Sequence, residues 1–207
     1  MSNLNFVLTG MTSLRYFVPL VLAAKKRNIN CVFYLGRDNR KYNSVRSINN
    51  YDYLVRLTKS LNIDMLDIEK INSSIGPVFQ IEGDGWEGNN KNNGKKIALT
   101  YMSDYAMSSS YQNYINNVDY VVFPSKKLAE YYNCVNKKNV YLGSPKYDIK
   151  MKNKQEICKK YGLDVNKKFA LYAFPKIRDN NKVNTELITK IVRSKGYQII
   201  CKSRAKD

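Results

Sequence analysis

The stretch GPVFQIEGDGWEG, residues 76–88, gathers three carboxylates and four glycines in a chain whose formal net charge is +18. An apolar run over 78–81 predicts a strand, and the residues Glu82, Gly83 and Asp84 then begin a loop at its carboxyl end. Glycines allow such a loop to turn tightly or to approach a ligand closely. A carboxylate in that position can accept hydrogen bonds from sugar hydroxyls or act as a base. A simple tight turn is the alternative interpretation.

Histidine is absent from all 207 residues, which restricts the chemistry of any active site. Its absence removes the commonest general acid and base and every Ser-His or Cys-His nucleophile, so catalysis would use carboxylates, lysine, tyrosine or electrostatics. The four cysteines are far apart: Cys31, Cys134, Cys158 and Cys201. We therefore expect no structural zinc and no metal site. The apolar runs around Cys31 and Cys201 predict buried free thiols in a reducing compartment.

The composition is that of a globular protein, with 43% hydrophobic and 25% charged residues. No apolar run approaches the roughly 18–20 residues of a membrane span, and the N-terminus lacks the pattern of a signal peptide. We therefore expect a cytoplasmic protein without a membrane span. The positive charge favours a polyanionic partner that carries phosphates. Alternatively, evenly spread lysines form only a solvated surface.

Residues 1–150 alternate apolar strands with amphipathic helices. The first strand, 5–8, ends at a turn with Gly10, and Ser13 is the expected N-cap of the helix that follows. Apolar residues recur at helical spacing there: Leu14, Phe17, Val18, Val21 and Leu22. Further strands are expected at 31–35, 78–81, 97–99, 120–123 and 140–142, and further helices at 51–61 and 125–132. This order predicts an α/β, Rossmann-like layered domain with a mostly parallel sheet.

The rest of the chain is predicted to form a connector and an incomplete second unit. Residues 151–168 are lysine-rich and contain one short helix, 155–161, before Gly162. Residues 169–207 then show a β-α-β pattern. Two strands and one helix cannot bury both faces of a parallel sheet, so this pattern predicts only part of a Rossmann-like domain.

Several segments carry a resemblance to a known family. The opening FVLTGMTSLRYFVPLVLAAKKRNINCVFYLG resembles the start of the non-hydrolysing UDP-N-acetylglucosamine 2-epimerase family, and Gly83-Asp84 falls where that family has Gly-Asp. The segments VDYVVFPSKKLAEYY and NVYLGSPKYD look like its strand-Pro-Ser/Thr-helix and Gly-Asn-Pro-x-x-Asp elements. The segments FALYAFPKIRDNN and YQIICKSRAKD are similar to the start of the second domain of these epimerases and of related glycosyltransferases and glycerophosphotransferases. All of these share the two-domain GT-B fold.

The chain also departs from the epimerase pattern. Ser13-Leu14 replaces the Arg and Glu of that family, and the segment 99–104 replaces its His-Val-Glu-Ala-Gly. Arg178 matches the His-Arg-x-Glu-Asn motif, whereas its histidine has no counterpart. Epimerisation needs those acid and base groups, so an epimerase-like sugar-nucleotide enzyme is the alternative hypothesis. Glycosyl transfer requires fewer of them.

The resemblance therefore implies a glycosyltransferase-like protein of glycan or surface-polysaccharide biosynthesis. Such proteins bring a sugar nucleotide and a glycan acceptor together in an interdomain cleft. A UDP-sugar is the expected donor, and no tightly bound cofactor is expected. The expected base for the acceptor hydroxyl is Asp84, followed by Asp104. Nucleotide and phosphate binding is expected from Arg178, Lys202 and Arg204, for which exposed surface charge is the alternative. Substrate binding is expected from Gly10, Glu82, Gly83 and Tyr101.

The resemblance covers an acceptor half and only the start of a donor half. We therefore expect no independent turnover by these 207 residues, which would be a shortened or degenerate chain or would need a partner that supplies the missing domain. The hypothesis from another class is a basic nucleic-acid-binding module, with seventeen tyrosines available to stack on bases. Against it, several tyrosines in predicted strands are expected in the core: Tyr34, Tyr120, Tyr141 and Tyr172.

Overall fold

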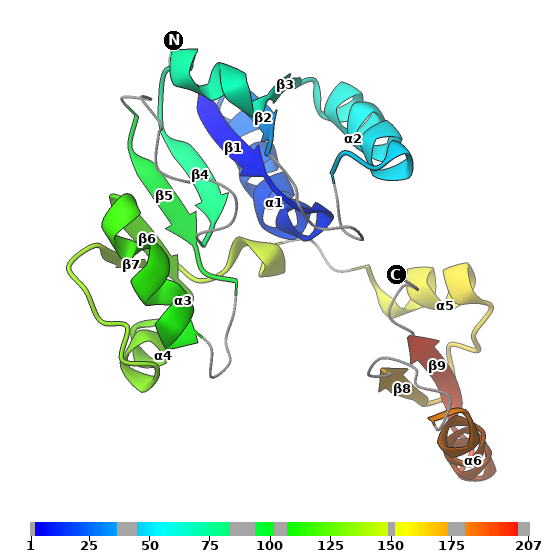
Figure 1. Cartoon of the computed structure of the whole chain (residues 1–207). Coiled ribbons are helices and arrows are strands. Elements are labelled where there is room, and N and C mark those ends of the chain that lie inside the picture. Colours follow the sequence, from blue (N-terminus) through cyan, green and yellow to red (C-terminus); the bar gives the residue numbers. More distant parts are fainter. Residues whose placement is uncertain are drawn as a thin grey trace. The chain divides into compact units, whose positions relative to one another are not determined.

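The computed structural model describes residues 3–36, 45–82, 94–101, 107–148, 152–173 and 181–202. The chain divides into two compact units, Met1–Ile149 and Lys150–Asp207. The first unit contains a seven-stranded sheet and the second a two-stranded sheet (Figure 1).

Every pairing in the large sheet is parallel. Its strands are β1 (Leu4–Leu8), β2 (Cys31–Leu35), β3 (Asp64–Asp67), β4 (Val78–Ile81), β5 (Lys96–Leu99), β6 (Tyr120–Phe123) and β7 (Asn139–Tyr141). Their order is β3-β2-β1-β4-β5-β6-β7. The chain thus builds outwards from β1 in one direction and from β4 in the other. The predicted α/β, Rossmann-like layered fold with a parallel sheet is confirmed.

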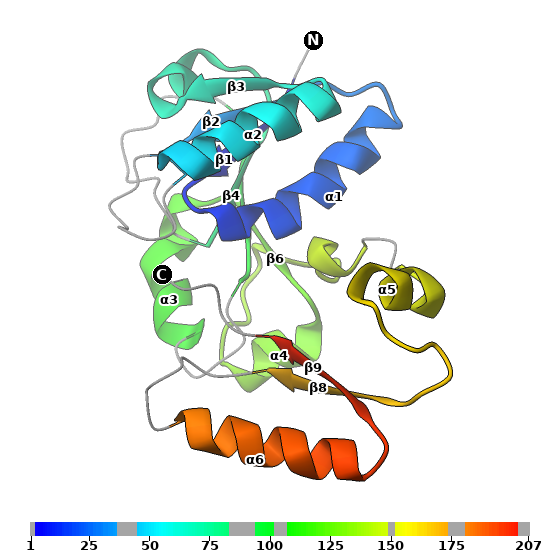
Figure 2. The same ribbon diagram turned by 90° about the vertical axis from the view of Figure 1, so that its right-hand side faces the viewer.

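Helices cover both faces of this sheet (Figure 2). They are η1 (Met11–Ser13), α1 (Leu14–Lys25), α2 (Ile48–Leu61), η2 (Ile68–Ser73), α3 (Met107–Tyr114), η3 (Ile115–Asn117), α4 (Lys126–Tyr131) and η4 (Pro145–Tyr147), where η marks a 3₁₀ helix. Ser125 caps α4 as expected, because its side-chain oxygen accepts a hydrogen bond from the Leu128 N–H. The N-cap expected at Ser13 is wrong. Ser13 has helical dihedrals and makes no capping bond, since the 3₁₀ turn η1 runs directly into α1.

Successive core side chains of a strand point to opposite faces of the sheet, as the pleat requires. Phe6 and Phe33 face α1 and α2 together with Phe17, whereas Val7 and Val32 face η2 on the other side. Towards β6, the second face is covered by α3, η3 and α4.

The expectation that tyrosines of the strands are buried is only partly correct. Tyr34 is 3% exposed, but Tyr120 and Tyr141 are 43% and 36% exposed. Tyr141 lies on the edge strand β7, which has a neighbour on one side only. Tyr120 begins β6 beside an open hollow described below.

Gly76 holds the chain against the start of β1, and we expect Gly76→Ala to lower the free energy of unfolding by about 2–3 kcal/mol. Its φ is +112°, and an added Cβ would overlap the backbone oxygen of Asn3. The segment cannot move aside easily, because Asn3 N–H donates to the Ile75 oxygen at 3.0 Å and Asn5 N–H donates to the Pro77 oxygen at 3.0 Å. Urea unfolding followed by circular dichroism measures the loss.

Gly143 is the matched control for this substitution. Its φ is +80°, but nothing lies within 4 Å of an added Cβ. Gly143→Ala therefore tests the cost of the dihedral alone, about 1 kcal/mol. Equal losses in the two variants would contradict a steric role for Asn3.

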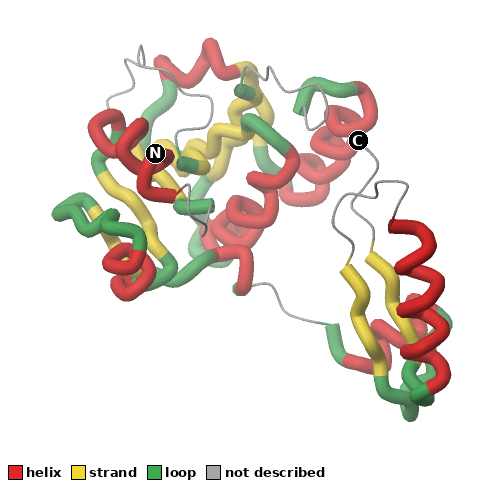
Figure 3. The backbone as a smooth tube through the Cα atoms, turned by 60° about the horizontal axis from the view of Figure 1, so that its bottom comes forward, coloured by secondary structure: helices red, strands yellow, loops and turns green. Residues whose placement is uncertain are grey.

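The second unit is a β-α-β unit preceded by a short helix. Its elements are α5 (Lys154–Tyr161), β8 (Phe169–Ala173), α6 (Asn181–Ser194) and β9 (Gln198–Lys202). Strands β8 and β9 are parallel, and α6 runs alongside them (Figure 3). Gln198 ties the loop after α5 to β9, because its side chain accepts from the Asp164 N–H and donates to the Asp164 oxygen, both at 2.8 Å. Leu171 on β8 is 68% exposed.

Candidate functional site

The carboxyl ends of the central strands form the candidate site. Strands β1 and β4 are neighbours at the point where the order of the sheet reverses, and open α/β sheets bind ligands at the carboxyl ends of strands at such a point. Gly10 follows β1, Glu82 follows β4 and Tyr101 follows β5 closely. These three residues are therefore brought to the same edge of the sheet, as expected for parallel strands.

Glu82 connects the ends of β4 and β5. Its carboxylate Oε1 accepts a hydrogen bond from the Tyr101 N–H at 2.8 Å, and its own N–H donates to the Leu99 oxygen at 2.9 Å. The residue is 7% exposed and has a φ of +47°, in the left-handed region that few residues other than glycine adopt. The Gln80 side-chain amide donates to the Glu82 backbone oxygen. These bonds hold the start of the acidic loop in a fixed position.

Tyr101 joins this edge to the first turn of α1. Its hydroxyl accepts a hydrogen bond from Arg15 Nη2 at 3.1 Å. Its ring centroid lies 5.9 Å from that of Tyr16, and the Arg15 guanidinium carbon lies 5.7 Å from the Tyr101 ring centroid. Tyr16 is 1% exposed and Tyr101 is 37% exposed, so the pair has one buried and one accessible member.

Lys146, from η4, also contacts Tyr16. Its Nζ is 5.4 Å from the Tyr16 ring centroid and 4.9 Å from the Tyr147 ring centroid. Burial lowers the pKa of Lys146, but the hydroxyls of Tyr16 and Tyr147 outweigh this effect and raise the pKa above its usual value. The ammonium group therefore stays charged at neutral pH.

Two tyrosines of α3, Tyr111 and Tyr114, are buried. Burial, and to a lesser degree the negative charge of Glu82, raise the pKa of Tyr114 far above its usual value. Burial also raises the pKa of Tyr111 to about 12, and its hydroxyl donates to Asn139 Oδ1 at 2.9 Å. Both hydroxyls are therefore neutral at physiological pH. Tyr114 thus contributes a neutral phenol to the surroundings of Glu82.

The predicted site residues are only partly covered by the structure. Gly10, Glu82 and Tyr101 lie at the carboxyl edge as described, and Gly10 begins η1 by accepting the Ser13 N–H at 3.0 Å. Lys202 is the last residue of β9, and its side chain lies outside the described part. The following predicted residues lie outside the described ranges: Gly83, Asp84, Asp104, Arg178 and Arg204.

Three residues of the site were not predicted from the sequence: Arg15, Tyr16 and Lys146. Arg15 and Tyr16 occupy the first turn of the helix that follows the first strand and its glycine turn. That position was a usable signal, because such a turn adjoins the carboxyl edge of the sheet. Lys146 lies within the segment 143–148, which the sequence marked for its pattern but not for its lysine.

Comparison with solved structures shows which fold this is. The chain matches a glycosyltransferase from Rickettsia africae ESF-5 at 12% identity and a TM-score of 0.56, over 100% of this chain and 69% of that one. It matches the wall teichoic acid polymerase TagF at 12% identity and a TM-score of 0.60, over 98% of this chain and 55% of that one. It matches Anabaena HepE at 7% identity and a TM-score of 0.53, over 99% of this chain and 70% of that one. The fold is GT-B-like.

Comparisons by sequence found no match that could support the GT-B-like fold. No protein-family profile matches the chain, and no curated protein matches it by sequence. One of these three structures is a glycosyltransferase by name, one is a wall teichoic acid polymerase and one was solved with UDP and glucose, which agrees with the transferase side of the resemblance found in the sequence. None of these three is an epimerase by name, so the resemblance to the epimerases remains a prediction.

The described part of this GT-B-like chain offers neither a metal site nor a membrane-spanning helix. No group of three or more His, Cys, Asp or Glu side chains that could hold a metal ion occurs in it. None of its described helices combines the length and the apolar character needed to cross a bilayer. Cys31, Cys134 and Cys158 are buried free thiols, which confirms the prediction for Cys31.

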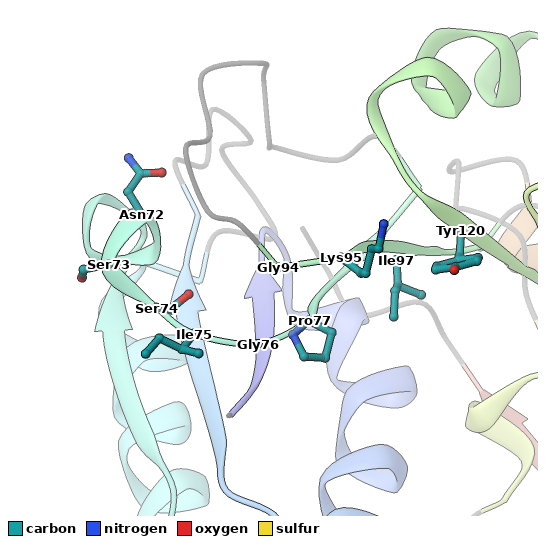
Figure 4. Close-up of a pocket in the computed structure, with 10 residues that line it drawn as sticks. All are labelled: Asn72, Ser73, Ser74, Ile75, Gly76, Pro77, Gly94, Lys95, Ile97 and Tyr120. Atoms are coloured by element: carbon teal, nitrogen blue, oxygen red, sulfur yellow. The ribbon is translucent and has the colours of Figure 1, made fainter. Parts of the chain in front are cut away.

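A hollow of about 780 Å³ lies at the amino ends of the strands, opposite the carboxyl edge (Figure 4). It is found where the chain enters β4, β5 and β6, whereas the candidate site lies where the chain leaves β1, β4 and β5. Its lining residues are Asn72, Ser73, Ser74, Ile75, Gly76, Pro77, Gly94, Lys95, Ile97 and Tyr120. Lys95 is paired there with Asp119 at 3.3 Å. Ligands of GT-B-like and other open α/β sheets bind at the carboxyl edge, so we place the candidate site there and not in this hollow.

Proposed function

We propose that this chain is a glycosyltransferase-like protein of glycan or surface-polysaccharide biosynthesis that uses a sugar nucleotide. The observation that carries the proposal is the GT-B-like fold with its polar cluster at the carboxyl ends of β1, β4 and β5. The names of the similar structures support the same class: HepE was solved with UDP and glucose, and TagF is a wall teichoic acid polymerase. A UDP-sugar is the proposed donor. The free buried thiols favour a reducing compartment, and we propose the cytoplasm.

The first unit is proposed to bind the glycan acceptor. Glu82 and Tyr101 would contact the acceptor at the carboxyl edge, next to the turn at Gly10. Because the Glu82 carboxylate is buried and accepts the Tyr101 N–H, it is suited to positioning. The next carboxylate of the same loop, Asp84, is proposed as the base that deprotonates the acceptor hydroxyl, with Asp104 as the second candidate.

The second unit is proposed to bind the donor diphosphate. Strands β8 and β9 are parallel and adjacent, so the segments that follow them leave the same edge of the small sheet. Lys202 ends β9, while Arg204 follows β9 and Arg178 follows β8 in the sequence. Basic groups at strand ends stabilise a leaving diphosphate without requiring a metal ion.

An epimerase-like function is the weaker candidate. The acid and base groups of the epimerase motifs have no counterpart here, and the chain has no histidine to replace them. Nucleic-acid binding remains the alternative from another class. It predicts steeply salt-dependent binding of mixed oligonucleotides, in contrast to saturable binding of one nucleotide.

Thermal melting with a ligand panel tests the proposal. The panel contains UDP-, GDP-, CDP- and dTDP-sugars and the free nucleotides. A ligand at about 100 times its dissociation constant stabilises a protein by about 2.7 kcal/mol. We expect a shift with UDP and UDP-sugars that is lost in Arg178→Ala and kept in Arg193→Ala, which removes an exposed charge from the last turn of α6.

Three results would contradict or change the proposal. If no nucleotide shifts the melting temperature, the chain does not bind the donor, and the proposed donor role of the second unit is wrong. A shift with a different nucleotide would change the donor and keep the class. A UDP shift that survives Arg178→Ala would move the diphosphate site away from the segment after β8.

A further inference from the structure

Two cations at the carboxyl edge have no acidic partner among the described residues. The ion pairs among the described residues join Arg46 to Asp67, Lys95 to Asp119 and Lys126 to Glu130. Within the described ranges, Arg15 and Lys146 take part in none of them. Both cations contact tyrosines instead. Each of these two positive charges is thus held against a tyrosine ring, with no compensating carboxylate from the described part of the chain.

These cations lie on one connected group of side chains from three segments. Arg15 contacts Tyr101, the Tyr101 ring lies beside Tyr16, and Tyr16 lies beneath Lys146. Arg15 and Tyr16 come from α1, Tyr101 from the segment after β5 and Lys146 from η4. We call these four residues the cation–tyrosine cluster. Helix η4 packs against α1, so segments from distant parts of the sequence build the cluster.

The donors of the cluster are only partly used. A guanidinium has five N–H donors, and Arg15 uses one of them in its bond to Tyr101. Arg15 is exposed, so its remaining donors can reach a ligand. A guanidinium fork matches the oxygens of a phosphate, and an ammonium group adds a compact charge. The partly exposed Tyr101 ring provides an apolar face of the kind on which a sugar ring can pack.

We infer that the cation–tyrosine cluster binds the phosphate of a phosphorylated sugar, which makes the acceptor of the proposed reaction a phosphate-bearing glycan. The inference rests on the proposed function, because it names the acceptor class for the same edge of the sheet. A phosphomonoester carries a charge of about −1.5 to −2 at neutral pH, which the two cations of the cluster can balance. A free hydroxyl of the same sugar would then lie towards Glu82.

Isothermal titration of the full chain tests this inference with three probes: glucose 1-phosphate, glucose and inorganic phosphate. We expect glucose 1-phosphate to bind more tightly than either of the others, because both parts of the molecule are contacted. The double variant Arg15→Gln, Lys146→Gln should weaken that binding by about tenfold or more, since two charge-assisted contacts are lost. The matched control is Arg56→Gln, Lys59→Gln, which removes two exposed cations of α2 and should leave binding unchanged.

A charge-conserving variant separates a binding defect from a folding defect. Arg15→Lys, Lys146→Arg keeps both positive charges and should retain more binding than the double glutamine variant. Unchanged affinity in the double glutamine variant, or no binding of glucose 1-phosphate by the unmodified chain, would overturn the inference. Equal affinities for inorganic phosphate and glucose 1-phosphate would overturn the acceptor assignment, because the sugar would then contribute nothing.

UDP-glucose in the same variants distinguishes this inference from the proposed function. We expect the double glutamine variant to bind UDP-glucose as the unmodified chain does. Loss of UDP-glucose binding in that variant would make the cluster a donor diphosphate site, which overturns the acceptor inference and leaves the glycosyltransferase proposal standing. Binding of glucose 1-phosphate through the cluster with no binding of any sugar nucleotide would support the phosphate site and contradict the proposed function.

Discussion

We expect Phe6→Ala to lower the free energy of unfolding of the first unit by about 3–5 kcal/mol. Phe6 lies on the central strand β1 and is 0% exposed. Its ring contacts Phe17 of α1, Phe33 of β2 and Phe79 of β4, with ring centroids 5.2, 5.9 and 5.1 Å away. Alanine would remove the shared partner of three aromatic rings and leave a cavity between the sheet and α1. Urea unfolding followed by circular dichroism gives the difference.

Phe6→Leu is the control for this substitution. Leucine retains most of the buried volume, so we expect a loss below about 1.5 kcal/mol. Similar losses in the two variants would mean that the aromatic contacts, and not the cavity, dominate. A loss below 1 kcal/mol in Phe6→Ala would contradict the packing described for β1. Ligand binding at the candidate site should weaken when the core is destabilised, since β1 leads into Gly10 and α1.

Asp84→Asn is expected to lower the rate of glycosyl transfer by about 10²–10⁴-fold, the usual contribution of a general base. The sequence places Asp84 two residues after Glu82, in the loop that leaves β4 at the reversal of the sheet order. Asparagine keeps the size of the side chain and removes the proton acceptor. The measurement is the rate of UDP release from UDP-glucose with an acceptor glycan, made with the chain together with the partner or domain that turnover is expected to need.

Two variants accompany this measurement. Glu82→Gln keeps an oxygen that can accept the Tyr101 N–H, so a positioning role predicts a much smaller loss of rate than in Asp84→Asn. Asp104→Asn tests the second candidate for the base. A large loss in Asp104→Asn with an unchanged rate in Asp84→Asn would transfer the role to Asp104. A large loss in Glu82→Gln would show that the charge of Glu82, and not only its hydrogen bond, takes part in the reaction.

A GT-B-like protein without histidine has to rely on groups of this kind. Its described carboxyl edge combines a buried carboxylate at Glu82, a neutral phenol at Tyr114 and two cations at Arg15 and Lys146. Under the proposed function, this arrangement would explain how acidic residues serve a strongly basic chain. Glu82 would face the hydroxyl groups of the acceptor, while the two cations would meet phosphates.

The sequence was sufficient to predict the parallel α/β sheet, because most of its strands are buried apolar runs. The run Cys31–Leu35 is an example: all five residues are buried. Two elements could not be predicted in this way. Strand β3 reads DMLD and lies at the edge of the sheet with its aspartates exposed, and helix α3 begins MSSS without a clear apolar period. Pairing with β2 and packing behind β5 and β6 stabilise them, and neither interaction is local in sequence.

The same distinction applies to the candidate site. Glu82 and Tyr101 could be predicted because each follows an apolar strand, and a strand's direction determines the edge at which its loop emerges. The cation–tyrosine cluster could not, since Arg15 and Tyr101 are 86 residues apart and Lys146 comes from a third segment. Local pattern determines which residues stand at strand ends. Only the order of the strands and the packing of η4 against α1 decide which of those residues meet, because these contacts depend on the assembled sheet.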